Sequence, residues 1–239
     1  MPNTINHNVS KRLHTSKQMS ESLITAAFLT LSGGFQDAYT YWCRGKVFAN
    51  AQTGNIVLMN TYLFDGQFYH ALLYLVPLLA FASGIFIAEL IHRHFKMIQA
   101  VHWRQLIVLG EIFLHFIVGF IPSSLDMLAN ALVSFVCAMQ VQTFRKVHGH
   151  AYASTMCIGN LRSGMDALCT YMHTKEKSTL HKSLHYIAII LIFAVGSGIG
   201  SIFAKSIGQR AIWISCLLLA VSFGIMFIKA EEDDDKYMP

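Results

Sequence analysis

Charged residues are scarce in this chain: Asp, Glu, Lys and Arg make up only 13% of its 239 residues. A soluble domain usually has about a quarter of its residues charged. Hydrophobic residues account for 54%, and the mean hydropathy is +0.46. Several apolar runs, of roughly 17 to 21 residues, are long enough to cross a bilayer as helices. The composition excludes an ordinary soluble domain and predicts an all-α, polytopic membrane helical bundle.

Motifs of several enzyme classes are also missing. The sequence has no Walker-type phosphate loop, GxSxG elbow or HExxH pair, which argues against an ATPase, an elbow-type hydrolase and a zincin protease. Its five cysteines are scattered without CxxC or metal-ligand spacing, and we interpret them as small buried hydrophobes. HRH at 92–94 and HGH at 148–150 have no carboxylate-rich surroundings. We therefore expect no metal site and no cofactor.

The most unusual stretch, residues 32–60, places polar groups inside an apolar run. A carboxylate at membrane depth costs at least about 2.5 kcal/mol on insertion scales, so Asp37 needs a reason. A weaker copy at 138–160 aligns Gln36 with Gln140 and Gly54-Asn55 with Gly159-Asn160. Paired irregular segments of this kind indicate a central site between two related halves.

Two related membrane halves are predicted, at 21–122 and 123–229, between a polar cytoplasmic tail (1–20) and an acidic C-terminal tail (230–239). Each half has three long apolar segments and one shorter polar segment that dips in and returns. The long segments are 23–43, 70–91, 105–121, 125–144, 184–204 and 211–228; the polar segments are 47–64 and 151–172. Small-residue faces around Gly84 and Gly196 predict that the third and seventh segments pack together.

The distribution of Lys and Arg favours six spans over eight. With six spans and two dipping segments, 14 cations lie inside and only Arg44, Lys46, Lys205 and Arg210 outside. With eight full spans, the division is 8 to 9, which shows no positive-inside bias. Six spans make the halves inverted and both termini cytoplasmic; eight spans remain the alternative. The net charge of +5 is then explained by topology and lipid headgroups, without a nucleic-acid partner.

The motifs GGxxDAxxY at 33–41 and VFANxxTGNxV at 47–57, with the echo at 138–164, carry a family resemblance. The sequence resembles the YoaK-type family of small bacterial inner-membrane proteins, whose domain is of unknown function. The resemblance spans nearly the whole chain and implies a bacterial inner-membrane location and a duplicated helical domain. It supplies no reaction or substrate. Residues 138–141 (AMQV) replace a GLQN-like turn and Ile158-Gly159 replaces a TG pair, so any two-fold site would be lopsided.

Asp37 is the first candidate for a proton or cation site, or for a partner of a substrate amine. Gly33 and Gly34 would open the helix so that carbonyl groups could also coordinate. The alternative is a buried carboxylate that locks the fold through a hydrogen bond to a neighbouring helix.

The remaining candidates also have structural alternatives. Turns at the two Gly-Asn pairs would line an aqueous path, or would only pack helices. Glu111 and His115, four residues apart, would relay protons, or would satisfy each other near the interface. Arg162 and Asp166 have the same spacing and are predicted to form a structural ion pair or to lie at headgroup level. The predicted pathway comprises Gly33, Gly34, Asp37, Tyr41, Thr53, Gly54, Asn55, Glu111, His115, Gln140, Gly159 and Asn160.

These features lead to a small-solute transporter or channel as the first hypothesis. A membrane-embedded enzyme that acts on a lipid, and a non-catalytic membrane assembly or interaction protein, remain alternatives. The expected partners are the lipid bilayer, an unknown small solute and, in a homodimer, a second copy of the chain.

Overall fold

The computed structural model describes residues 23–95, 103–147, 150–152 and 154–234, so the whole predicted N-terminal tail (1–20) lies outside the described residues. Apart from one short hairpin, the regular elements in these ranges are helices, which confirms the all-α class. In chain order they are α1 (Leu23–Cys43), α2 (Gln52–Phe64), α3 (Phe68–Phe95), α4 (Trp103–Val118), η2 (Ser123–Leu125), α5 (Asp126–Thr143), β1 (Lys146–Val147), β2 (His150–Ala151), α6 (Cys157–Thr174), α7 (Lys177–Ile207), η3 (Gly208–Ala211) and α8 (Ile212–Asp234).

Each of the eight predicted segments contains one helix, but the two polar segments become helical later than expected. Residues 47–51 and the stretch before α6 are not helical, and α2 has only 13 residues. The antiparallel hairpin of β1 and β2 was not predicted at all. At its other end the chain stays helical longer than expected, because α8 extends to Asp234 and so into the acidic tail.

Each of the longest helices packs mainly against a helix from the other predicted half. α1 packs most extensively against α7, and α5 packs most extensively against α3, while α4 and α8 contact each other and one helix of the opposite half. The prediction that the third and seventh segments pack together is therefore wrong. Their glycines instead allow close contact with two other helices. A Cβ on Gly196 would overlap the carbonyl oxygen of Leu31 in α1, and one on Gly84 would overlap that of Phe135 in α5.

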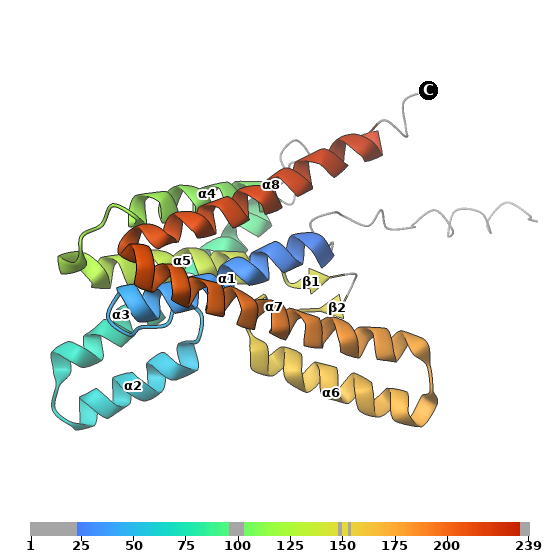
Figure 1. Cartoon of the computed structure of the whole chain (residues 1–239), viewed down its shortest axis with the longest axis horizontal. Helices are drawn as coiled ribbons and strands as arrows, with labels where there is room; N and C mark the ends of the chain where they lie inside the picture. The colour runs from blue at the N-terminus through green and yellow to red at the C-terminus, as the bar shows by residue number, and fades with distance from the viewer. Residues whose placement is uncertain (1–22, 96–102, 148–149, 153, 235–239) are drawn as a thin grey trace, which may run out of the picture.

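Equivalent helices of the two halves run in opposite directions along the long axis (Figure 1). α1 runs toward the left end of this view and α5 toward the right. α2 starts nearer the middle and runs out toward the end where α1 finishes, and α6 does the same toward the end where α5 finishes. The non-helical stretches before α2 and α6 therefore lie nearer the centre of the molecule than the far ends of these helices.

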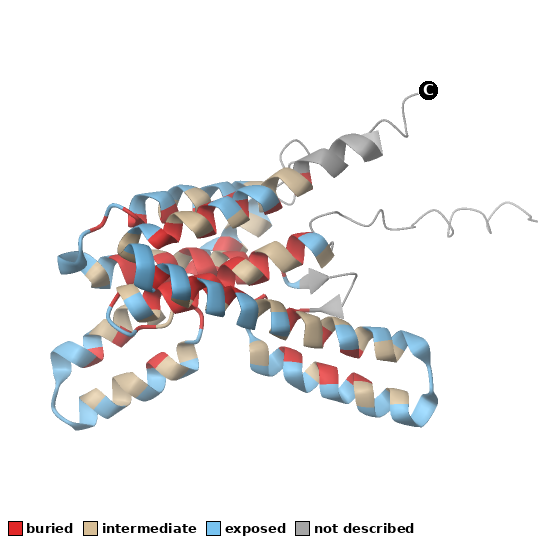
Figure 2. Ribbon diagram, viewed as in Figure 1, coloured by how far each residue is buried: buried red, intermediate tan, exposed pale blue. Residues whose placement is uncertain are grey.

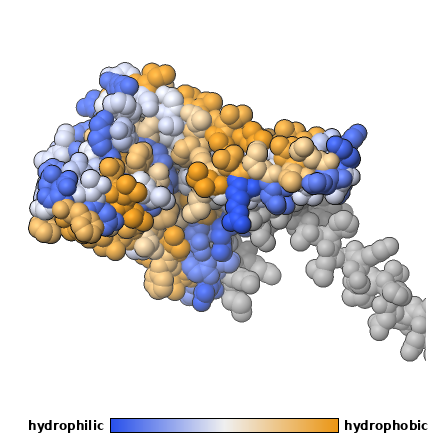
Figure 3. All heavy atoms as spheres, turned by 90° about the horizontal axis from the view of Figure 1, so that it is seen from below, coloured by the Kyte–Doolittle hydropathy of each residue, from blue (hydrophilic) through white to orange (hydrophobic). Residues whose placement is uncertain are grey.

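Buried residues concentrate where α1, α5 and α7 run together, whereas the outer parts of α2, α3, α6 and α7 are mostly exposed (Figure 2). Much of this exposed surface is apolar, including Phe86, Phe113 and Ile202 at 65%, 62% and 67% exposure. Figure 3 shows large hydrophobic areas on one face, with hydrophilic residues gathered mainly toward the two ends.

Three helical stretches in the described ranges are long and apolar enough to cross a membrane: Phe68–His94, Ser123–Thr143 and Lys177–Met226. The last of these contains both α7 and α8. With so much of their apolar surface exposed, these stretches are those of a membrane protein. α4 has 16 residues and falls short of the roughly 20 that a bilayer requires.

Candidate functional site

A buried polar cluster lies where four helices meet, centred on Gln36 of α1. The side-chain amide nitrogen of Gln36 donates to Ser32 Oγ (3.0 Å), to Ser215 Oγ of α8 (3.0 Å) and to Glu111 Oε1 of α4 (3.1 Å). Its amide oxygen accepts from the thiol of Cys137 in α5 at 2.8 Å. Ser32, Gln36, Glu111, Cys137 and Ser215 are called the Gln36 cluster below. Its members come from four helices: α1 provides two of them, and α4, α5 and α8 provide one each.

Next to this cluster, α4 buries polar atoms that have no partner. Glu111 is 1% exposed and His115, one turn later, is 0% exposed. Glu111 Oε2 and both ring nitrogens of His115 have no hydrogen-bond partner in the described part of the chain. The alternative that the two residues satisfy each other near the interface is therefore wrong. Because a buried polar group without a partner is costly and rare, these atoms mark the site.

Asp37 faces the loop at residues 47–51. Its Oδ1 accepts a 2.7 Å hydrogen bond from the backbone amide of Asn50, and Asn50 Nδ2 donates to the carbonyl oxygen of Gly33 at 3.3 Å. Asp37 is 6% exposed. The carboxylate thus anchors the loop to α1, whereas the structural alternative expected its hydrogen-bond partner on a neighbouring helix. α1 is not opened at Gly33 and Gly34, contrary to the prediction, because it stays helical through both.

The loop before α6 reaches the same part of α1. Tyr152 Oη lies 2.8 Å from Thr30 Oγ1 and donates to the carbonyl oxygen of Ala26 at 3.1 Å. Burial raises the pKa of Tyr152 well above its usual value, so the hydroxyl stays protonated. A Cβ on Gly33 would overlap Thr155 of this loop. The two loops therefore meet α1 at Gly33, one through Asn50 and the other through Thr155.

Gln140, the counterpart of Gln36, fixes the second loop. Its Nε2 donates to Ser154 Oγ and to the carbonyl oxygen of Leu29, both at 3.2 Å. Its Oε1 has no partner among the described residues, and neither has Asn50 Oδ1 in the first loop. One buried amide oxygen at each loop, from Asn50 in the first loop and from Gln140 of α5 beside the second, is thus able to accept a further hydrogen bond.

Asn55 of the TGN motif holds the first loop in place. Its Oδ1 accepts from the Phe48 amide at 3.0 Å, and its Nδ2 donates to the Phe48 carbonyl at 2.7 Å and to Gln52 Oε1 at 3.0 Å. Gly54 lies against the ring of Phe48, whereas Thr53 is exposed. The motif positions the loop rather than lining the buried cluster.

Several other predicted residues lie away from the Gln36 cluster. Tyr41 stacks on Phe48, with 5.2 Å between ring centroids. In α6, Gly159 is exposed and Asn160 is buried. Arg162 and Asp166 are both exposed and form no ion pair, so that part of their prediction is wrong.

Sequence reasoning missed the role of Arg44, which it assigned to an outside loop. Arg44 is 0% exposed and pairs with Asp126 Oδ1 at 2.8 Å. Its guanidinium also donates to Tyr39 Oη, to the carbonyl oxygen of Val118 and to that of Ile121, each at 2.9 Å. Arg44 therefore caps the end of α4. The only signal in the sequence was a lone acid, Asp126, just after the turn.

Cys137 was also missed as a site residue. Its thiol donates to Gln36 Oε1, on the same side chain whose amide nitrogen donates to Glu111. Nothing in its sequence context distinguishes it from the other four cysteines.

A family model described as a protein of unknown function (DUF1275) matches residues 25–225, which include the Gln36 cluster, both loops and all eight helices in whole or in part. This match agrees with the resemblance to an uncharacterised family. No curated protein and no solved structure matches the chain.

Proposed function

The chain belongs to the DUF1275 family, and we propose that it is a small-solute transporter or channel whose path passes the Gln36 cluster. The bacterial inner membrane, which the sequence resemblance implies, is its proposed location. Both termini are proposed to lie in the cytoplasm, as the distribution of Lys and Arg favours.

The proposed membrane arrangement has six spans: α1, α3, α4, α5, α7 and α8. α2 and α6, together with the loops before them, are the two segments that dip into the membrane and return to the side from which the chain entered. Two observations support this arrangement. The equivalent helices α1 and α5 run in opposite directions, and α2 and α6 each start nearer the middle of the molecule and run outward (Figure 1). Inverted repeats with interrupted segments at mid-membrane are the usual frame of a transport site.

The observation that carries the proposal is the set of unpaired atoms on α4. A purely structural network has every buried donor and acceptor satisfied, because an unsatisfied one costs about 1 to 3 kcal/mol. Glu111 Oε2 and the His115 ring are instead left without protein partners, one turn apart on the same buried face. Ionisable residues inside a membrane most often mark a path for ions, protons or solutes.

The residues then have separate roles. Glu111 and His115 bind the solute or carry a proton, and Gln36 holds Glu111 in position through its amide. Asn50 Oδ1 and Gln140 Oε1 offer acceptors at the loops. Asp37 keeps the first loop in place and contributes to the site only by positioning that loop.

Electrical recording from proteoliposomes on a solid-supported membrane tests this proposal. The probes are rapid steps in pH and in a panel of small amines, carboxylates, sugars and alkali cations. We expect a protein-dependent current for at least one probe, and a loss of about tenfold or more in Glu111→Gln, because the variant cannot ionise. Glu89→Gln is the matched control, since Glu89 is paired with Arg93 near the end of α3.

Two results would count against the proposal. One is the absence of current for every probe, which would favour an assembly or lipid-modifying role. The other is a Glu111→Gln variant that conducts as well as the natural protein. Thermal unfolding in detergent separates loss of transport from loss of fold, because Gln retains an oxygen to accept from Gln36 and the variant should stay folded.

A further inference from the structure

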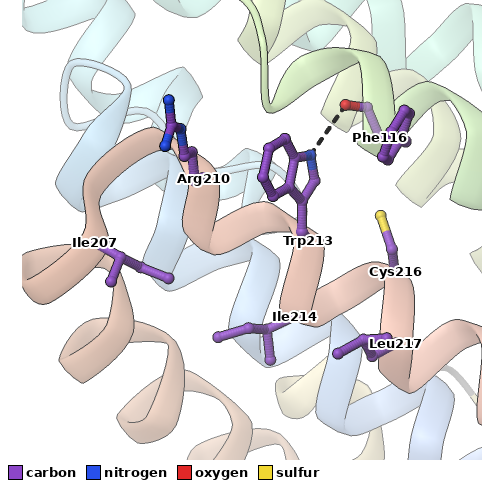
Figure 4. Close-up of a pocket in the computed structure, with 7 residues that line it drawn as sticks. All are labelled: Phe116, Ile207, Arg210, Trp213, Ile214, Cys216 and Leu217. Carbon is purple, nitrogen blue, oxygen red and sulfur yellow. Dashed lines mark hydrogen bonds between the residues drawn. The ribbon is translucent and has the colours of Figure 1, made fainter.

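An apolar groove opens on the outer surface beside the turn between α7 and α8. It has a volume of about 740 Å³ and is lined by Phe116, Ile207, Arg210, Trp213, Ile214, Cys216 and Leu217. Figure 4 shows these residues, which come from α4, the end of α7, η3 and the first turns of α8. Leu217 and Ile207 are 67% and 49% exposed, so the groove faces the surroundings of the protein rather than its core.

One end of the groove carries its single charge. Arg210 lies at the turn, in η3, while the other lining residues are apolar or aromatic (Figure 4). The indole N–H of Trp213 donates to the carbonyl oxygen of Phe116 at 3.1 Å, so it is not free for a ligand. No carboxylate of the described residues pairs with Arg210, which is exposed. Arg210 contributes its aliphatic part to the apolar wall, and its guanidinium, at the rim, is the charged group nearest to an occupant.

Neighbouring side chains place this end at the level of lipid headgroups. Lys46 and Lys205 both lie over the ring of Trp42, at 3.8 and 3.9 Å from its centroid. Lys205 and Arg210 flank the same turn after α7. Tryptophan and basic residues gather where a bilayer meets water. Unlike these two lysines, Arg210 is not stacked on an aromatic ring in any described contact.

We propose that the groove binds an anionic phospholipid, with an acyl chain along α4 and α8 and the phosphate on Arg210. Charge complementarity decides the occupant: an apolar groove with the guanidinium of Arg210 at its rim, beyond the apolar wall, matches a molecule with one long apolar chain and one phosphate. Arginine also binds phosphate oxygens bidentately, which favours this headgroup geometry. From Arg210 to Leu217 the helix advances about 10 Å, enough for the upper part of an acyl chain.

Trp213 provides a reporter inside the groove. The chain has three tryptophans, so Trp42→Phe and Trp103→Phe leave Trp213 as the only fluorophore. This protein is placed in phosphatidylcholine vesicles that contain increasing fractions of either brominated phosphatidylglycerol or brominated phosphatidylcholine. Bromine on an acyl chain quenches a tryptophan that it contacts, so the titrations report which lipid occupies the groove.

We expect brominated phosphatidylglycerol to be preferred about fivefold, the effect of one basic residue on an anionic lipid. Arg210→Gln should abolish the preference, Arg210→Lys should retain part of it, and Lys205→Gln should leave it unchanged. If Arg210→Gln fails to fold, Arg210→Lys still tests the proposal, because it keeps the positive charge at this position.

Three results would overturn the proposal. The first is equal quenching by the two lipids in the parent protein, and the second is a preference that survives Arg210→Gln. The third is quenching by neither lipid, which would mean that a second copy of the chain covers the groove. Added inorganic phosphate should not reduce the preference; if it did, Arg210 would be a site for the free ion.

Discussion

Two buried ionisable residues, Arg44 and Glu111, differ in how completely their polar atoms are hydrogen-bonded. Arg44 has its guanidinium surrounded by one carboxylate, one hydroxyl and two carbonyl oxygens. Glu111 has one oxygen bonded to Gln36 and the other without a partner in the described residues. A saturated charge serves the structure, whereas an unsatisfied one is available to something that the protein binds. This contrast is the basis for assigning stability to Arg44 and transport to Glu111.

Replacing Arg44 should destabilise the protein strongly. Arg44→Met removes the donor to Val118, Ile121 and Tyr39 and leaves Asp126 unpaired, so we expect a loss of about 3 kcal/mol in the free energy of unfolding. Arg145→Met is the control, because Arg145 is 54% exposed and 3.5 Å from Glu89; its loss should stay within about 0.5 kcal/mol. Unfolding in detergent measures both. Similar losses in the two variants would show that Arg44 is not the cap described here.

At the scale of elements, α1 is the helix on which both loops and both halves converge. It contributes Gly33 and Asp37 to the loops, Gln36 to the buried cluster, and a glycine-lined face to α7. Gly34 and Gly196 bring the backbones of α1 and α7 close together, since a Cβ on either would overlap a carbonyl oxygen of the other helix. The position of the site therefore depends on this helix pair.

Substitutions at two glycines of α7 distinguish the effect of close helix packing on stability from the effect of helix propensity. Gly196→Ala should cost about 1 to 3 kcal/mol of stability, because the added methyl group meets the α1 backbone. Gly198→Ala should be neutral or stabilising by up to about 1 kcal/mol, since nothing lies within 4 Å of its Cβ position and alanine favours a helix. Gly84→Ala, in the α3–α5 contact, should behave like Gly196→Ala. Equal tolerance at positions 196 and 198 would contradict the observed packing.

Hydrophobic run length was sufficient to predict a helical protein with a helix in each of the eight segments; the division into two related halves stays a prediction. It also singled out Glu111 and His115, because charged groups in apolar runs are visible in the sequence. Which helices pack against each other was not predictable from the sequence. Gly84 and Gly196 indicate close helix contacts but do not indicate which helix makes them. The role of Arg44 was hidden for a similar reason, since its partners are mainly backbone carbonyls of α4 and the following turn.

At the scale of the whole molecule, the packing of α1 on α7 and of α3 on α5 joins the two predicted halves into one unit. Each half places its first helix on the third helix of the other, so neither half contains its own main packing partner. The turns at one end also lie together: the side-chain amide of Gln209, in η3, lies 2.6 Å from Ser123 Oγ of η2, and Arg44, just after α1, donates to the carbonyl oxygen of Ile121 in the same α4–α5 turn. This shared end is the reason to expect the α4–α5 and α7–α8 turns on one side of the membrane.

The most direct test of this account is the side of the membrane on which each turn lies. Single cysteines replace Asp65, Ser124, Ser178 or Ser206, all of which are exposed, in a chain without its five native cysteines. A membrane-impermeant maleimide is then added to intact cells and, separately, to permeabilised cells. Six spans with inverted halves predict that positions 65, 124 and 206 label from outside, while position 178 labels only after permeabilisation. If positions 65 and 124 grouped with 178 instead, the chain would cross eight times with parallel halves, and the account would be wrong.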